Sequence, residues 1–430
     1  MGDGNVKIGR ACVAILPAIL IAGLSNAQTV DDAISAALLE SPALDRTEAG
    51  IKAAREGVRQ ARAAYLPEVT FSASASTARR DARLRESSDF SETSEPTSVT
   101  IRASQPLYTN GLRQVAQQQA TNTVRARRHE QEATRLDVAL QVVEAMVQLD
   151  LARKSASLDR TLQSLLRDQV RAEEERYRLE TGTQTNVVQA RARLAAAEAA
   201  ITASDMGVQQ AEIRLALLTG YPVDMLAPMI TASAELPPSL DDALFLAREN
   251  SPNIALARSS YTAARLGAVT AARKYGPQIN LSAEASTART PSPAIEQDDD
   301  IRATLTFSMP LFNGGRSSSE RRQAYAERRA SAADVRKAGQ DLQRHVTDTW
   351  VRLASAKSRL TALQVRLDAA GEALKGVRQG QQAGLWTVTD ILDAMEERVE
   401  AERALEQARA EHILSAYELS ITCGLYILPR

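Results

Sequence analysis

The chain has 430 residues and a formal net charge of −1 at pH 7, so it lacks the positive field that would attract nucleic acid. Aromatic residues make up only 4% of it, and long stretches are rich in Ala, Gln, Glu and Arg, which is typical of long helices rather than thick cores. The composition therefore argues against a row of ordinary globular domains and against a nucleic-acid partner.

Residues 1–27 have the pattern of a secretory signal peptide. Lys7 and Arg10 precede an apolar run over 11–24, and Ser25-Asn26-Ala27 is a plausible cleavage site. The alternative is a membrane anchor, but about 14 apolar residues fall short of the roughly 20 that a spanning helix needs, and no later segment is longer. We predict cleavage after Ala27, which leaves a single cysteine, Cys423, hence no internal disulfide and no lipid anchor.

The two halves of the chain resemble each other. Ser41-Pro42 recurs 210 positions later as Ser251-Pro252, and from Pro106 onward the offset is 204, which relates Pro106 to Pro310. An ordered series of such matches indicates a duplication. We therefore predict a first structural repeat at 28–220, a linker at 221–240 and a second repeat at 241–430.

Each half contains two segments in which apolar and polar residues alternate, as in a strand with one apolar face. They predict β-hairpins at 68–105 and 278–309, with long charged loops at 79–97 and 289–300. The strand length suits a tilted membrane strand of about 9–11 residues. A half-buried soluble sheet is the alternative, but an isolated hairpin is not stable in water, so other strands must complete the sheet. Aromatic residues stand at the helix-side strand ends, as at a membrane interface: Tyr65, Tyr108, Tyr275 and Phe312.

The rest of each half predicts helices of unusual length. The stretches after Gly111 and Gly315 contain no proline over more than a hundred residues, and each is interrupted once, near Gly182 and Gly384. The longer arm, about 70 residues, would extend about 105 Å. Apolar residues follow a 3-4 spacing along it, which predicts a coiled-coil seam. Shorter helices at 42–64, 186–218, 252–274 and 390–422 would pair with the long ones, although a simple two-stranded coiled coil remains an alternative for the helices alone.

The joins between strands and helices carry recurring motifs. Tyr65-Leu66-Pro67 and Tyr275-Gly276-Pro277 precede the first strand of each hairpin, and Pro106 and Pro310 begin the segments that lead to Gly111 and Gly314. Proline does not extend a strand ladder, so we expect Pro67, Pro106, Pro277 and Pro310 to end strands. Asn and Gly tolerate the positive φ of a sharp join, which gives these residues a structural role.

Together these motifs, which span the mature chain, resemble the TolC family of outer-membrane efflux and secretion channels. The resemblance implies a mainly α fold with a membrane β-barrel portion: a homotrimer whose long helices form an α-barrel and whose four strands per protomer complete a 12-stranded β-barrel. It also implies contact with outer-membrane lipid, a periplasmic extension in a Gram-negative cell, and partners consisting of a periplasmic adaptor (membrane fusion protein) and an inner-membrane pump or ABC transporter.

The resemblance further assigns roles to the helical tips. It places the periplasmic gate or constriction at Thr185, Asn186, Gln381, Trp386, Asp390 and Asp393, and adaptor docking at Gly182, Thr183, Gly384, Leu385 and Thr387. Asp390 and Asp393 match aspartates that ring the family's constriction, where threefold repetition would favour cations. The alternative is that they are ordinary acids at a helix start, stabilised by the helix dipole. Gln381, Trp386 and Asn186 depart from the family's closing residues, so the closing bonds would differ.

Nothing in the sequence predicts an enzyme or a cofactor. His129, His345 and His412 are scattered without ligand spacing, no nucleotide loop occurs, and acidic runs such as Glu173-Glu174-Glu175 are expected to be solvated. The leading hypothesis is therefore a passive export duct, gated at its periplasmic end, in a tripartite efflux pump or a type I secretion system. A periplasmic coiled-coil scaffold or adaptor without a pore is the alternative.

Overall fold

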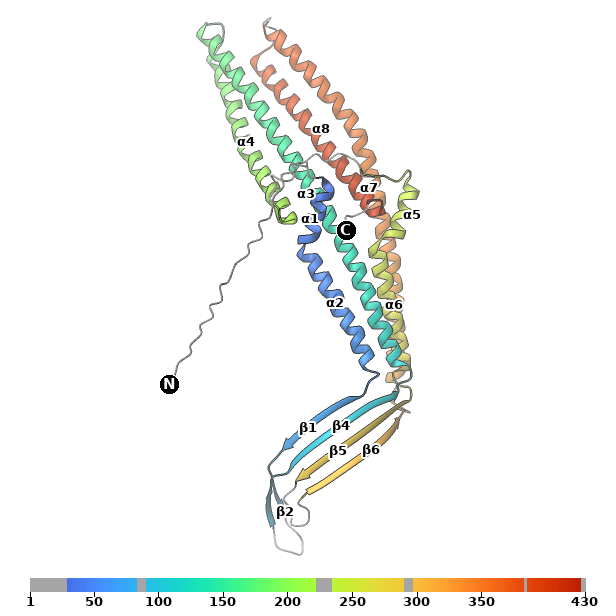
Figure 1. Cartoon of the computed structure of the whole chain (residues 1–430). Coiled ribbons are helices and arrows are strands. Elements are labelled where there is room, and N and C mark those ends of the chain that lie inside the picture. Colours follow the sequence, from blue (N-terminus) through green and yellow to red (C-terminus); the bar gives the residue numbers. More distant parts are fainter. Residues whose placement is uncertain (1–28, 83–89, 222–233, 290–296, 383–384, 427–430) are drawn as a thin grey trace, which may run out of the picture.

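The structure is a computed structural model, and it describes residues 29–82, 90–221, 234–289, 297–382 and 385–426. The expected signal peptide lies outside these ranges. The molecule is elongated, with a β-sheet at one end and long helices that run from the sheet to two tips at the other end (Figure 1).

Each half of the chain contributes four of the described helices, of which one is much longer than the other three. The first half contains α1 (Val30–Glu40), α2 (Pro42–Ala63), α3 (Leu112–Arg178) and α4 (Gln184–Thr219), and the second contains α5 (Leu240–Asn250), α6 (Pro252–Arg273), α7 (Arg316–Gln382) and α8 (Val388–Cys423). Both α3 and α7 have 67 residues, which corresponds to about 100 Å. On the sheet side α2 packs on α3, and on the tip side α4 does, so two short helices pair with one long helix as predicted (Figure 1). The same holds for α6, α8 and α7.

Side chains cap several of the helix starts, and the two starts that share a Ser-Pro motif differ in this respect. The hydroxyl of Ser251 accepts the Ile254 N–H before α6, as its Ser-Pro start suggests. Ser41 makes no such bond before α2, although Pro42 still occupies the first helical position there. A shared Ser-Pro motif therefore specifies where both helices begin but not which bond caps them.

The main sheet consists of four antiparallel strands in the order β1-β4-β5-β6. They are β1 (Glu68–Ala75), β4 (Thr97–Tyr108), β5 (Gln278–Arg289) and β6 (Gln297–Ser308). The two hairpins are joined through β4 and β5, which pair along their lengths. Within this sheet the outer edges of β1 and β6 have no neighbour among the described residues.

Two predictions about the strands are wrong in detail. The expected loop over 79–97 contains a further antiparallel pair, β2 (Ala78–Ala82) and β3 (Phe90–Ser94), because its residues continue the ladder beyond the main sheet. β5 and β6 likewise extend into the expected loop at 289–300. Pro106 does not end its strand: it lies inside β4 opposite Asn280, and the register shifts between Pro106 and Tyr108 to accommodate it.

The hydrophobic core is thin and divided along the helices. One cluster lies where α1, α3 and the ends of α4 and α8 meet, a second lies near the tips, and a third joins α5, α7 and α8. Among the described residues, no helix combines the length and the apolar character that crossing a membrane requires.

Candidate functional sites at the sheet and the helical tips

One face of the main sheet is apolar and exposed. The pairing places Phe71 opposite Ile101, Ile101 opposite Ala285, and Ala285 opposite Ile301, so these side chains form one row across all four strands. Phe71, Ile101 and Ile301 are all exposed in the protomer. The alternation predicted from the sequence is thus confirmed. A contiguous exposed apolar surface of this kind needs another surface or a lipid phase to cover it.

The opposite face of the sheet is polar. Thr70, Arg102, Glu284 and Arg302 form the adjacent row, and the Arg102 guanidinium lies 2.6 Å from a Glu284 carboxylate oxygen. Arg302 is 3.1 Å from Asp300 on its own strand. The sheet therefore separates an apolar surface from a hydrophilic, charged one.

The joins between sheet and helices have the backbone expected from their motifs. Asn110 and Gly111 have φ of 50° and 76°, and Gly314 and Gly315 have φ of 62° and 82°, conformations that Asn and Gly reach at least cost. Of the expected strand ends, Pro67 and Pro277 directly precede β1 and β5, and Pro310 lies two residues after the end of β6.

Side chains tie the two joins to each other. The Asn110 amide donates to the Arg273 carbonyl at 3.0 Å, and it fills the space beside Gly276, where a Cβ would overlap it. The Tyr275 hydroxyl and the Lys274 ammonium both bind Glu320, each at 2.9 Å. These bonds fix the end of the sheet to the long helices.

In both tips a threonine side chain caps the outgoing helix, but only the second tip adds a carboxylate to the cap. Thr183 accepts the Asn186 N–H before α4, and Thr387 accepts the Asp390 N–H before α8, both at 3.3 Å. In the second tip the Asp390 carboxylate also accepts from the Thr387 hydroxyl and backbone N–H, at 2.6 and 2.7 Å. Those two bonds, the hydroxyl first, hold the pKa of Asp390 below its ordinary value.

Asp393 lies next to an arginine from the other helical hairpin. The Arg193 guanidinium on α4 is 3.0 Å from the Asp393 carboxylate and 2.6 Å from that of Glu396, both on α8. Arg193 stands 200 positions before Asp393, and no spacing rule relates the two. The structure therefore shows a compensating cation beside one of the two aspartates assigned to the constriction.

Gln381 belongs to a polar cluster around Glu173. Glu173 is only 1% exposed, and one of its carboxylate oxygens accepts from Gln169, Arg176 and Gln381 at 2.7, 2.5 and 3.3 Å. Gln381 also accepts from Arg176 at 3.2 Å, which joins α3 to α7 near the tips. The expectation that Glu173 is solvated is wrong; it occupies a seam position, seven residues after Leu166, and that spacing could have revealed it.

The other assigned tip residues are placed as follows. The Trp386 indole covers Gly380, where a Cβ would overlap it. Thr185 and Leu385 are exposed, and Gly182 lies against the Arg176 backbone in the first tip. Gly384 lies outside the described residues.

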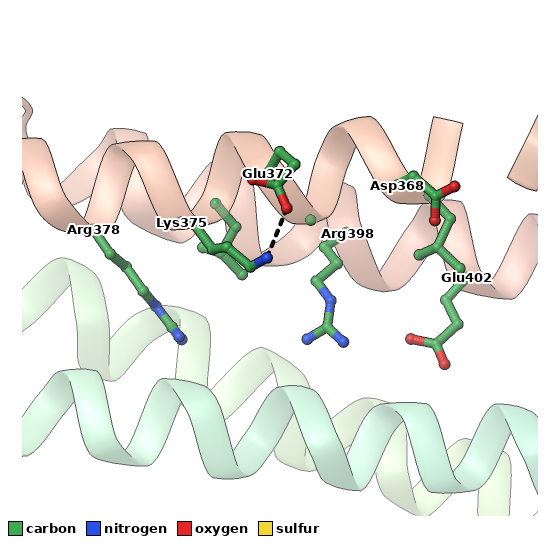
Figure 2. Close-up of a pocket in the computed structure, with 9 residues that line it drawn as sticks. Asp368, Glu372, Lys375, Arg378, Arg398 and Glu402 are labelled. Atoms are coloured by element: carbon green, nitrogen blue, oxygen red, sulfur yellow. Dashed lines mark hydrogen bonds and ion pairs between the residues drawn. The ribbon is translucent and has the colours of Figure 1, made fainter. Parts of the chain in front are cut away.

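A groove of about 580 Å³ lies between α7 and α8, several turns before the tips (Figure 2). Its lining includes side chains of both charges, of which Glu372 and Lys375 form an ion pair at 2.6 Å. Arg378 and Arg398 point into the same space and form no ion pair with the part of the chain that the structure describes (Figure 2). The groove thus offers free positive groups close to the tips.

Replacing Thr387 with Ala is expected to fray the first turn of α8. The loss of an N-cap costs about 1 kcal/mol of helix stability. In the unmodified chain the bonds to Asp390 stabilise the turn above the unfolded carboxyl pKa of about 3.9, and this stability is lost as pH falls through the lower folded pKa. Amide hydrogen exchange over 388–391 measures both effects. Thr183→Ala is the control, because the first tip has Asn186, which does not titrate, in the place of Asp390. If exchange in the first turn of α4 and in the first turn of α8 depended equally on pH, the prediction would be contradicted.

The fold and these surfaces define a channel protomer with long helices and a sheet. Comparison with known proteins gives the same class of molecule. The sequence profile of the outer membrane efflux protein family matches residues 33–221 and 243–422. The chain belongs to this family.

Similar proteins support that assignment. Outer membrane efflux protein BepC of Brucella suis is 26% identical over 97% of this chain and 90% of its own length. Alkaline protease secretion protein AprF of Pseudomonas aeruginosa is 23% identical over 85% of this chain and 78% of its own. The crystal structure of VceC from Vibrio cholerae superposes with a TM-score of 0.76 at 22% identity, covering 92% of this chain and 96% of VceC.

These findings confirm the predicted fold class and the resemblance to TolC-type channels. The protein is an outer-membrane channel component of a Gram-negative cell with a periplasmic extension, and its family consists of channels rather than enzymes.

Proposed function

We propose that three copies of the protein form one passive export duct, with the strands as a 12-stranded barrel in outer-membrane lipid and the helices as a tunnel into the periplasm. The observation that carries this proposal is the four-stranded sheet, which exposes an apolar face and has two edges, β1 and β6, unpaired within it. Backbone groups cannot remain unpaired in lipid, so the edges need partners from other copies.

The helical tips are proposed as the gate and the docking end. Asp390, Asp393, Trp386, Gln381, Asn186 and Thr185 would line the constriction, and Gly182, Thr183, Gly384, Leu385 and Thr387 would meet a periplasmic adaptor. The groove in Figure 2 supports docking near this end, because its unpaired Arg378 and Arg398 suit an acidic helix of such an adaptor.

An inner-membrane pump or ABC transporter would supply the energy and choose the cargo. BepC is named for efflux and AprF for protease secretion, so this chain serves either a tripartite efflux pump or a type I secretion system. We also propose that 28–220 and 241–430, separated by a linker at 221–240, are the two structural repeats of each copy.

Planar-bilayer recording of the purified protein tests the proposal. Discrete conductance steps, together with a trimer that survives SDS, are expected for a duct. A protein that stays monomeric or dimeric without detergent and gives no conductance would contradict it and would support a periplasmic scaffold without a pore.

Replacing Arg193 with Ala is expected to make the pore more cation-selective. The substitution leaves Asp393 and Glu396 without the cation that lies within 3.0 Å of each, so net negative charge at the proposed constriction rises. The reversal potential in a KCl gradient measures this change. Arg191→Ala is the matched control, because Arg191 pairs with Glu174 of its own hairpin. An equal shift in both variants would show that Arg193 does not act at the constriction.

A further inference from the structure

A hollow of about 360 Å³ lies at the join between the sheet and the helices, where α6 ends and α3 begins (Figure 1). We call it the join pocket. Two arginines line it, Arg113 and Arg273, together with the tyrosines Tyr65 and Tyr108, and no acidic side chain does. Gly111 leaves room for the second arginine, since a Cβ there would lie 2.6 Å from a guanidinium nitrogen of Arg273. Neither guanidinium forms an ion pair with the part of the chain that the structure describes.

Arg113 is held in place by neutral groups. Its guanidinium donates to the carbonyls of Leu107 and Ala64 at 2.9 and 3.5 Å, and it lies over the ring of Tyr65, 4.6 Å from the ring centre. These partners orient the guanidinium but carry no net charge, so they do not neutralise it. The positive charge of Arg113 is therefore fixed beside the join pocket before any ligand binds.

The corresponding join in the second half balances its own charge. Tyr275 stands 210 positions after Tyr65, the offset that also relates Ser41 to Ser251. The Tyr275 hydroxyl and the neighbouring Lys274 ammonium both bind the Glu320 carboxylate, so the cation has its acid within the chain. The uncompensated charge is thus particular to the first join and is not a requirement of the motif. We expect its counter-charge to come from outside the chain.

The join pocket adjoins the apolar face of the sheet. Tyr108 pairs with Ile279, and alternation along β5 places Ile279 on the same face as Leu281 and Ala285. Tyr108 therefore stands at the helix-side end of the apolar face, where aromatic side chains meet lipid headgroups in membrane barrels. The strands next to the pocket, β4 and β5, are the inner strands of the sheet. The pocket thus does not lie at the edges that the proposed barrel closes.

We propose that the join pocket binds the phosphate of an anionic phospholipid in the periplasmic leaflet, one lipid per copy. A guanidinium donates two parallel N–H bonds to phosphate oxygens, and two guanidiniums without an acid match a headgroup with net negative charge. A zwitterionic headgroup brings its own cation and matches the pocket less well. The acyl chains then lie along the apolar face of the sheet, and the bound lipid fixes the depth of the sheet in the membrane. The inference rests on the proposed placement of the sheet in lipid.

Native mass spectrometry of the assembled protein, purified in detergent and titrated with phosphatidylglycerol, tests the inference. The unmodified protein is expected to retain one such lipid per copy. Arg273→Gln is expected to weaken this binding roughly tenfold to a hundredfold, because it removes a charged donor to the phosphate. The Arg273 side chain is exposed, so the variant should still assemble and conduct. Arg316→Gln is the matched control: it removes one positive charge at the start of α7, outside the pocket, and should bind the lipid as the unmodified protein does.

Two further probes identify the source of the phosphate. Phosphatidylcholine and inorganic phosphate are both expected to bind the unmodified protein much more weakly than phosphatidylglycerol. Equally tight binding of either probe, or an equal loss of lipid in R273Q and R316Q, would overturn the inference, since the pocket would then not select an anionic lipid. A trimer that conducts but retains no phosphatidylglycerol would overturn it and leave the duct intact. Absence of both trimer and conductance would overturn the proposed function as well.

Discussion

Replacing Leu305 with Arg is expected to prevent stable insertion of the protein into the outer membrane. Leu305 lies on the apolar face of β6, opposite Leu281, and it is exposed in the protomer. An arginine on the lipid face of a barrel costs roughly 2–4 kcal/mol near the bilayer centre, and a trimer incurs this cost three times. The measurement is the amount of SDS-resistant trimer recovered from the outer-membrane fraction.

The matched control is Thr304→Arg, one residue earlier on the same strand. Successive strand residues point to opposite faces, so the new arginine joins the polar face, opposite Ser282 and next to the row that contains Arg302. We expect this variant to insert and to conduct. Loss of trimer in T304R but not in L305R would mean that the faces are reversed, and equal recovery of both would mean that the sheet does not lie in lipid.

The architecture could be predicted because each of its elements has a strong local signal. Alternation along a strand and the 3-4 spacing along a helix are properties of neighbouring residues, and Pro and Gly mark where one changes to the other. The two halves of the sequence repeat these signals, and Ser41-Pro42 and Ser251-Pro252 both stand at a helix start. These features are formed by residues that are close together in sequence, so they do not depend on how the two halves of the chain pack.

The contacts at the tips could not be predicted because they join residues that are far apart in sequence. Arg193 reaches Asp393 only because α4 and α8 meet, and the spacing that places Glu173 in a seam does not identify Gln381 of α7 as its partner. Local rules treat a run of three glutamates as solvated, and they treat a proline as a strand end. In Glu173 and Pro106 the tertiary contact overrides the local preference, through a buried polar cluster in one case and a bulge in the other.

Replacing Arg403 with Ala is expected to destabilise the joint between α3 and α8 strongly. Asp159 is 4% exposed and lies 2.6 Å from Arg403, so the substitution leaves a buried carboxylate without its cation. Removing one partner of a buried pair costs about 3–5 kcal/mol, because the remaining charge stays desolvated. Amide hydrogen exchange around 399–407, in the assembled protein in detergent, measures the free energy of local opening. Arg366→Ala is the control: its pair with Glu397 is about half exposed, and such pairs contribute about 0–1 kcal/mol.

The double variant Asp159→Leu with Arg403→Ala then separates charge from packing. It introduces the residues Leu and Ala, which the chain itself carries 204 positions away, at Leu363 and Ala199. Because no charge remains buried, we expect most of the loss seen in R403A to be recovered. The two hairpins of one copy would then stay joined without an ion pair at this position. A double variant as unstable as R403A would show that Arg403 acts through packing rather than by neutralising Asp159.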